Sequence, residues 1–240
     1  MRFLLVDTAD SRGSVALVRD DRPESVEAHP ADSNYSSWLL PAVRRILAPS
    51  GLSLAALDGY AVCSGPGSFT GLRIGLTTVK AWAEIYHRPI ASVSRLTALA
   101  GEGSRGPAVA APLVAAYLDA QREQVFAALY EREGRVLESE SVCGLAGFVT
   151  RVAGRAGSLP VLWRTPDPQL LEGVPEWHSR NAAGDALEPI APPFAAPLAA
   201  AAYRNFRSGQ VTDALGLDAN YVRRSDAEIF WTGNSAAMKA

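Results

Sequence analysis

The stretch Ser64-Gly65-Pro66-Gly67-Ser68-Phe69-Thr70-Gly71-Leu72-Arg73-Ile74-Gly75 decides how this chain folds. An apolar run from Leu57 to Cys63 predicts a strand before it, and apolar residues at three- and four-residue steps up to Tyr86 predict a helix after it. Glycine permits close backbone approach, and Thr70 can cap the helix. Free N–H groups at the helix start can receive an anion, although neither a Walker loop nor a dinucleotide fingerprint is present. The stretch therefore predicts a strand–loop–helix unit that is either a structural turn or an anion site.

Strand and helix patterns alternate on both sides of this stretch. Upstream, Phe3 to Val6 and Ser14 to Val18 predict a hairpin with Asp7 at the mouth of its first strand. Apolar spacing predicts a helix over 37–47, and Ile90 to Val93 predicts a further strand. This alternation favours an α/β sheet over a bundle or a sandwich.

The second half of the chain repeats the theme of the first. Glu102 to Pro107 is the best boundary signal, because it is small, polar and rich in glycine and proline. It divides the chain into domains 1–103 and 104–240. Leu118-Asp119 precedes a turn and a second apolar strand, as Val6-Asp7 does, which suggests a duplicated fold. The other predicted elements are strands at 108–118, 124–130, 135–142, 24–28 and 219–224, a helix at 195–207 and a loose tail at 233–240.

Composition limits what the chain can be. Its 240 residues are 48% hydrophobic and 20% charged, which is typical of a soluble globular protein. The net charge of -2 counts against autonomous, tight binding of nucleic acid. Two cysteines, Cys63 and Cys143, are too few for a disulfide framework. We find neither a signal peptide nor a stretch long enough to span a membrane, so we expect a cytoplasmic protein with no membrane partner.

The glycine-rich stretch resembles the Gly-Pro-Gly-Ser-Phe-Thr-Gly-x-Arg-x-Gly signature of the TsaB (YeaZ) family. Further matches, in the family's order, are Val6 to Ala9, Leu39-Leu40-Pro41, Leu118 to Phe126 and Asn220 to Arg224. Tyr35 departs from the family, since many members carry a histidine there. The resemblance implies an α/β fold of two actin-like (ribonuclease H-like) lobes, the second reduced. The residues that carry the family motif are Gly65, Pro66, Gly67, Ser68, Phe69, Thr70, Gly71 and Arg73.

In an actin-like fold, an aspartate at the mouth of each domain's first strand helps to hold a magnesium-bound nucleotide. Asp7 and Asp119 occupy these places by resemblance. The turns that follow them are bulky and charged, which blocks the close backbone approach of a phosphate, so we expect a degenerate nucleotide site.

We predict no catalytic residue and no metal site. The histidines at 29, 87 and 178 lack the i, i+4 partner that binds metal on one helix face in TsaD-type relatives. Ser68 is not in a Gly-x-Ser-x-Gly elbow.

Large apolar side chains on the two predicted helices suggest a partner surface. Two tryptophans on neighbouring helices exceed what a covering face usually requires, and aromatic residues anchor interfaces. The family is understood to pair through these helices, with itself or with TsaD. The predicted interface residues are Trp38, Leu39, Val43, Ile46, Leu76, Val79, Trp82 and Tyr86.

The resemblance implies a non-catalytic subunit of the machinery that makes N6-threonylcarbamoyladenosine (t6A) in tRNA. It would bind and activate the TsaD transferase, work with a TsaE-type ATPase and touch tRNA only through the complex, and the free protein would be a monomer or a homodimer. No intrinsic cofactor is expected, and ATP or ADP would bind, if at all, only at the partner interface. The alternatives are an independent peptidase, an actin-like ATPase or kinase, and a self-associating scaffold unrelated to tRNA.

Overall fold

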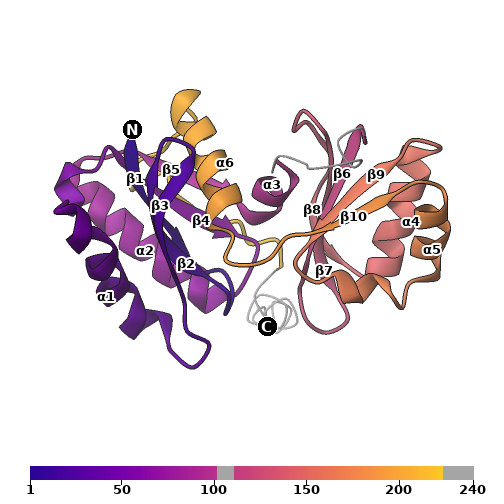
Figure 1. The fold of residues 1–240 in the computed structure, drawn as a ribbon, viewed down its shortest axis with the longest axis horizontal. Coiled ribbons are helices and arrows are strands. Elements are labelled where there is room, and N and C mark those ends of the chain that lie inside the picture. The colour runs from indigo at the N-terminus through magenta and orange to yellow at the C-terminus, as the bar shows by residue number, and fades with distance from the viewer. Residues whose placement is uncertain (102–110, 224–240) are drawn as a thin grey trace, which may run out of the picture.

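Two five-stranded sheets form the two lobes of the protein (Figure 1). The computed structural model describes residues 1–101 and 111–223. Helices cover the outer face of each sheet, and further helices fill the space between the sheets (Figure 1). The predicted α/β class is therefore confirmed.

The first sheet has the strand order β3-β2-β1-β4-β5. Strands β1 to β3 are antiparallel, and Val6 pairs with Val15 as the predicted hairpin requires. Strands β4 and β5 run parallel to β1, so the end of β1 and the end of β4 lie at one edge of the sheet. This parallel pairing brings Asp7 next to the glycine-rich loop. The strands are β1 (Arg2–Asp7), β2 (Ser14–Arg19), β3 (Arg22–Ala28), β4 (Gly59–Gly65) and β5 (Ile90–Ser94).

The second sheet repeats this arrangement, with the order β10-β9-β6-β7-β8. Three consecutive antiparallel strands are again followed by two parallel strands on the other side of the first. Asp119 ends β6 as Asp7 ends β1, so the suggested duplication is confirmed. The second lobe was expected to be reduced, but its sheet is not, because it has five strands like the first sheet. The strands are β6 (Leu113–Asp119), β7 (Val125–Glu131), β8 (Val136–Cys143), β9 (Val161–Thr165) and β10 (Ala186–Pro189).

Helices form three layers around the two sheets (Figure 1). Helices α1 (Tyr35–Leu47) and α2 (Phe69–Tyr86) cover the outer face of the first sheet. Helices α3 (Arg95–Ala100) and α6 (Ala195–Arg207) lie between the sheets, and α4 (Leu145–Ala156) and α5 (Pro175–Ala182) cover the second sheet. The reduction of the second lobe thus concerns its outer helices, because α5 has 8 residues where α2 has 18.

Apolar packing joins the lobes. One core cluster extends from α1 and α2 through the first sheet and α6 to inner-face residues of the second sheet such as Ala116 and Tyr130. A second cluster around Trp163 fills the space between the second sheet and α4 and α5. Because α3 packs on β5 of the first sheet and on β6 of the second, it contributes to the contact between the lobes.

The C-terminal part of the chain returns to the first lobe. Helix α6 was predicted correctly at 195–207, and it packs on the first sheet. The boundary at 103/104 falls outside the described residues and stays a prediction, as does the tail at 233–240. Residues 219–223, the described part of the predicted closing strand, form no strand. Within residues 1–101 and 111–223, no helix is both long and apolar enough to cross a membrane.

Candidate functional site

The glycine-rich loop packs against the end of β1. The glycines at 67 and 71 lie so close to the backbone of Ala9 and Thr8 that a Cβ atom would overlap the carbonyl oxygens there. The Ser68 N–H donates to the Ala9 carbonyl at 2.5 Å, and the Thr8 hydroxyl donates to the Gly71 carbonyl at 2.7 Å. The motif glycines thus allow α2 to approach β1, and the Ser68 N–H is not free for an anion.

Ser68, and not Thr70, caps α2. Its hydroxyl accepts a hydrogen bond from the Gly71 N–H at 3.3 Å, whereas Thr70 is an exposed residue of the first turn. The predicted role of Thr70 is therefore wrong. The reason is that α2 begins at Phe69, which places Thr70 inside the helix rather than at its N-cap.

Asp7 lies fully buried at the end of β1, bound to Arg95. The Nη2 atom of Arg95 donates to both carboxylate oxygens, at 2.7 and 2.8 Å, and the Ala9 N–H donates to one of them at 3.0 Å. Arg95 is the first residue of α3 and only 1% exposed. Burial alone would lower the pKa of the Arg95 guanidinium, but Asp7 and Asp10 outweigh it and raise that pKa.

Ion pairs continue from Arg95 across to the second lobe. Nη1 of Arg95 lies 2.7 Å from Oδ2 of Asp10, and Nη2 of Arg12 lies 2.9 Å from the same oxygen. Nη1 of Arg12 then donates to Oδ1 of Asp167 at 2.8 Å, on the loop after β9. Burial alone would raise the pKa of the Asp10 carboxyl, but Arg95 and Arg12 outweigh it and lower that pKa. Sequence analysis missed Arg95 and Asp167 because nothing in their local sequence marks them.

Tyr35 stabilises the turn that carries Asp10 and Arg12. Its hydroxyl donates to the Asp10 carbonyl and accepts from the Gly13 N–H at 3.0 Å. Burial and the nearby carboxylates of Asp7 and Asp10 raise the pKa of this phenol, so it stays a donor. The residue that departs from the family pattern thus supports the turn between β1 and β2.

Asp119 sits in a different environment from Asp7. Its carboxylate accepts from the backbone N–H of Gln121 at 2.7 Å and from the Gln121 side chain at 2.9 Å, and its own N–H donates to Asp167 at 3.1 Å. Residues 121–123 all have positive φ, which forms the turn from side chains that are not glycine. The two predicted aspartates therefore end equivalent strands, but Asp7 is paired with the Arg95 guanidinium whereas Asp119 accepts from the amide groups of Gln121.

A magnesium-bound nucleotide does not fit these residues. A divalent cation needs several oxygen ligands, and at Asp7 both oxygens already bind a buried guanidinium. A second cation there would be repelled at short range inside a site of low polarity. In residues 1–101 and 111–223, no group of three His, Cys, Asp or Glu side chains is arranged to hold a metal ion.

A cleft of about 660 Å³ opens between the lobes beside these ion pairs. The turn after β1, the glycine-rich loop and the turn after β6 line it, and residues 220–223 lie along one side. The Phe69 and Tyr221 rings lie 5.1 Å apart there, and the Arg73 guanidinium stacks on Phe69 at 3.7 Å while donating to the Tyr221 hydroxyl. Two motif residues, Phe69 and Arg73, therefore hold the C-terminal segment in place.

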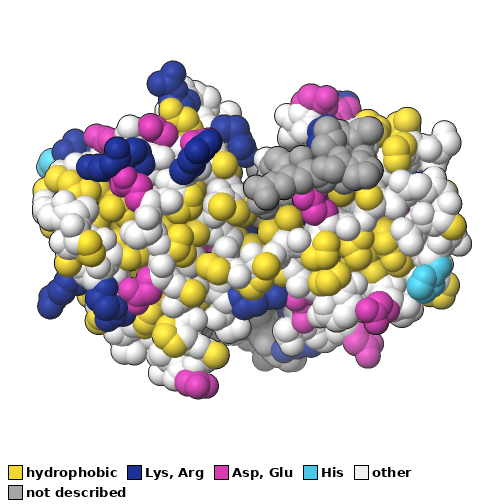
Figure 2. All heavy atoms as spheres, in the orientation of Figure 1, with side chains coloured by type: hydrophobic (Ala, Val, Ile, Leu, Met, Phe, Trp, Pro, Cys, Tyr) yellow, Lys and Arg dark blue, Asp and Glu magenta, His cyan; other side chains and the backbone are white. Residues whose placement is uncertain are grey.

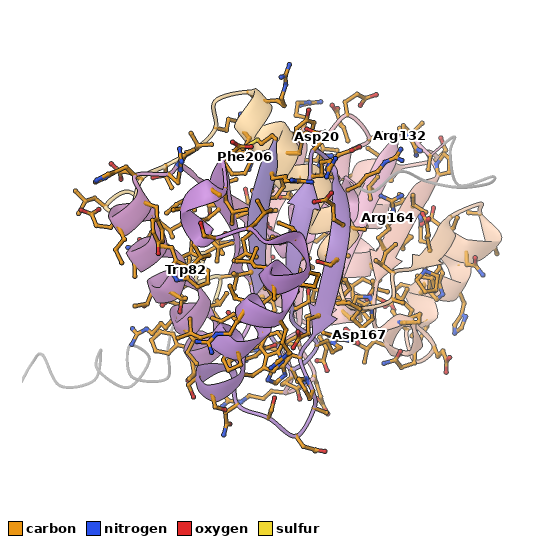
Figure 3. The ribbon with its side chains drawn as sticks, turned by 60° about the vertical axis from the view of Figure 1, so that its left-hand side comes forward. Asp20, Trp82, Arg132, Arg164, Asp167 and Phe206 are labelled. Atoms are coloured by element: carbon orange, nitrogen blue, oxygen red, sulfur yellow. The ribbon has the colours of Figure 1, made fainter. Side chains whose placement is uncertain are left out.

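The predicted partner residues on α1 and α2 face the sheet and not the solvent. Trp82 is 7% exposed, packs against Tyr60 with ring centroids 5.8 Å apart, and lies in the helix layer over the first sheet (Figure 3). Tyr86 is half-buried against the same core. The apolar spacing of this set follows the side of each helix that covers the sheet, so its use as a partner interface stays a prediction. The other buried members are Trp38, Leu39, Val43, Ile46, Leu76 and Val79.

Other apolar residues of the same helices are exposed. Leu40 on α1 is 58% exposed and Ile85 on α2 is 64% exposed. A groove of about 550 Å³ runs between the two helices, with Leu40, Phe69 and Arg73 along it. Elsewhere, positive and negative side chains are interspersed over both lobes (Figure 2).

The sequence has relatives of known family. Residues 26–152 match the family model described as TsaD, tRNA N6-adenosine threonylcarbamoyltransferase. The chain is 33% identical over 138 residues to the tRNA threonylcarbamoyladenosine biosynthesis protein TsaB of Bacillus subtilis, which covers 58% of this chain and 58% of that protein. The chain thus spans less than two thirds of the length of this curated relative.

Solved structures agree with the fold. A Pseudomonas aeruginosa structure described as similar to peptidase YEAZ superposes with a TM-score of 0.74 at 29% identity, over 92% of this chain and 99% of that one. The Lmo2764 protein of Listeria monocytogenes shares the two-lobed fold alone, with a TM-score of 0.51 at 11% identity over 87% of this chain and all of that one. The lobes are thus actin-like, as predicted, and the family model spans just over half of the chain. This chain belongs to the TsaD-related family, on its TsaB (YeaZ) branch.

Proposed function

We propose that this chain is a non-catalytic subunit of the machinery that synthesises t6A in tRNA. Its relatives in Bacillus subtilis and Escherichia coli are named for that biosynthesis. The observation that carries the proposal is the Arg95 guanidinium on Asp7, at the position where an actin-like enzyme would bind its metal and nucleotide. An Asp7 carboxylate occupied in this way supports a binding role over an independent ATPase or kinase.

The partner that we propose is a TsaD-type transferase, docked on the outer faces of α1 and α2. The groove between these helices combines exposed apolar groups, Leu40 and Phe69, with the cation of Arg73. Apolar anchors within a polar rim are typical of protein interfaces. The buried residues of the same helices support this surface from below and do not touch the partner.

Other components follow from the same proposal. A TsaE-type ATPase joins the complex, ATP or ADP binds only at the partner interface, and tRNA is contacted through the assembled complex. When TsaD is absent, a second copy of this chain occupies the same groove as a homodimer. TsaD and the second copy therefore compete for one surface.

Co-elution with the TsaD protein of the same organism on a sizing column tests this proposal. We expect a stable complex with the wild-type chain and its loss with Leu40→Glu. Leu215→Glu is the matched control, because Leu215 is 91% exposed and lies far along the chain from α1 and α2. If the complex still forms with Leu40→Glu and with Ile85→Glu, the interface does not lie on α1 and α2.

Two other results would overturn the proposed function itself. Peptide hydrolysis by the isolated chain would support the peptidase alternative, and saturable micromolar ATP binding would support the kinase alternative. A homodimer that TsaD cannot displace would instead indicate a scaffold unrelated to tRNA.

A further inference from the structure

We propose that a chain of ion pairs bridges the interlobe cleft and fixes the angle between the lobes, in the place where the fold would otherwise hold a metal-bound nucleotide. The chain runs through Asp7, Arg95, Asp10, Arg12 and Asp167, and we call it the interlobe clamp. This inference goes beyond the proposed function and requires no partner. It makes the protein a rigid body and not a hinged one.

The clamp crosses between the lobes at one ion pair. Arg12 lies on the turn after β1, and Asp167 lies two residues after β9. Their Nη1 and Oδ1 atoms are 2.8 Å apart, and the other oxygen of Asp167 accepts the Asp119 N–H at 3.1 Å. Arg12 is thereby bound to the ends of two neighbouring strands of the second sheet, β6 and β9, so a rotation of that sheet would break the pair.

On the first-lobe side, the clamp is held in a fixed position. Asp10 binds Arg95 and Arg12 at once, and Arg95 is in turn bound to the fully buried Asp7. Burial strengthens the charge–charge interaction of Asp7 with Arg95, because little water is present to screen it, whereas the Arg12 side chain is 31% exposed. A lost Arg12–Asp167 pair would therefore free the second lobe while the first-lobe cluster stayed intact.

At its far end, α3 fixes the lobes at a second place. The buried Arg164 of β9 donates from Nη1 to the carbonyls of Leu99 and Ala100, at 3.1 and 2.9 Å, at the C-terminal end of α3. Arg95 is at the opposite end of the same helix. Arg164 and Asp167 lie at separate heights behind the first sheet (Figure 3). The α3 contact thus acts as the pivot, and the clamp closes the cleft away from it.

Other links also cross between the lobes and have to be separated from the clamp, among them a hydrogen bond from Ser94 at the end of β5 to Glu140 of β8. The Asn220 N–H donates to the Ser64 carbonyl of the first lobe at 2.8 Å, and its side chain donates to Glu140 of the second lobe at 2.5 Å. Asn220 is partly buried and contributes no charge of its own. We infer that the Asn220 contacts adjust to the positions of the two lobes and do not determine the angle between them.

Spin-label distances between the lobes test the clamp. Labels at Ala81→Cys on α2 and Ser158→Cys after α4 are exposed and report on opposite lobes, in a Cys143→Ser background that leaves only the buried Cys63. We expect one narrow distance distribution for the otherwise wild-type chain, unchanged by magnesium and ATP. Asp167→Asn and Arg12→Gln each broaden it and shift it to longer distances.

Three comparisons make the result decisive. The double variant Arg12→Gln/Asp167→Asn should be no broader than either single variant, because both remove the same link. Arg45→Gln, which breaks an exposed ion pair to Glu27 within the first lobe, should leave the distribution unchanged. Asn220→Ala should also leave it unchanged.

The proposal is overturned if Asp167→Asn and Arg12→Gln keep the narrow wild-type distribution. It is equally overturned if Asn220→Ala broadens the distribution while the clamp variants do not. A shift of the wild-type distribution on adding magnesium and ATP would show that the clamp does not replace a nucleotide. All of these readouts use the isolated chain, so they stand whether or not TsaD binds.

Discussion

Replacing Arg95 by methionine gives the strongest test of the buried ion pairs. The substitution keeps an unbranched apolar side chain in the space of the arginine stem but removes the charge. Asp7 would then remain fully buried, and among residues 1–101 and 111–223 only the Ala9 N–H would still donate a hydrogen bond to it. Asp10 would keep Arg12 and is partly exposed, so it loses less.

The size of the effect follows from which carboxylate is left unpaired. Removing one partner of a buried ion pair costs about 3–5 kcal/mol, chiefly because the other charge remains buried. Only Asp7, and not Asp10, would be left buried and unpaired. The expected loss in the free energy of unfolding for Arg95→Met is therefore the cost of one such carboxylate, about 3–5 kcal/mol. In a domain of this size each kcal/mol lowers Tm by about 2–4 °C, which gives a fall of about 6–20 °C.

Urea unfolding followed by tryptophan fluorescence measures this loss. The double variant Asp7→Asn/Arg95→Met removes the unpaired charge and should recover to within about 2 kcal/mol of wild type. Arg45→Met breaks the exposed pair with Glu27 and should leave the free energy of unfolding almost unchanged. A loss below about 1 kcal/mol for Arg95→Met would refute the reasoning, because that is the effect of a surface pair. A double variant less stable than Arg95→Met would refute it as well.

Three further outcomes can be measured in the same assay. Trp82→Glu should lose at least about 3 kcal/mol, since it empties a buried aromatic site and buries a charge, and unchanged unfolding would place Trp82 on the surface. Gly71→Ala should lower the free energy of unfolding by about 1–3 kcal/mol, because its Cβ meets the Thr8 carbonyl. Gly154→Ala on α4 has open space around its Cβ and should raise the free energy of unfolding by up to about 1 kcal/mol. Equal effects of the two variants would contradict the close approach of Gly71 to Thr8. Asp10→Asn should be less stable than wild type at pH 7, and the difference should shrink as pH falls below about 4, because a carboxyl whose pKa is lowered on folding stabilises only while ionised. A difference that is constant down to pH 3 would mean that the Asp10 charge contributes nothing.

Local sequence patterns predicted most of the secondary structure correctly. The hairpin of β1 and β2, the helix after the glycine-rich loop and α6 all came from apolar spacing and turn residues, which depend on neighbours a few positions away. No prediction was possible for residues 145–190, where α4, β9, α5 and β10 lie. That segment is rich in small residues and proline, so its sequence shows no clear apolar spacing. Which of its residues are buried is decided by packing against the second sheet.

The site could be predicted only in part. Asp7 and Asp119 were placed at equivalent strand ends by the resemblance, and the sheet topology confirms that equivalence. Their surroundings were not predictable, because Arg95 lies 88 residues from Asp7 along the chain and Asp167 lies 155 residues from Arg12.

The sequence by itself determined the family, the α/β class and the duplicated strand–Asp–strand pattern, because these are written in local motifs and residue spacing. Tertiary structure alone decided which apolar side chains of α1 and α2 remain exposed. Large apolar residues at helical spacing can pack either on a sheet or on a partner protein, and the sequence does not distinguish the two. Only the packed structure shows that Trp82 is buried while Ile85 is exposed. It also decided that a guanidinium occupies the cleft, since the packing of two sheets on α3 brings distant charges within hydrogen-bonding distance.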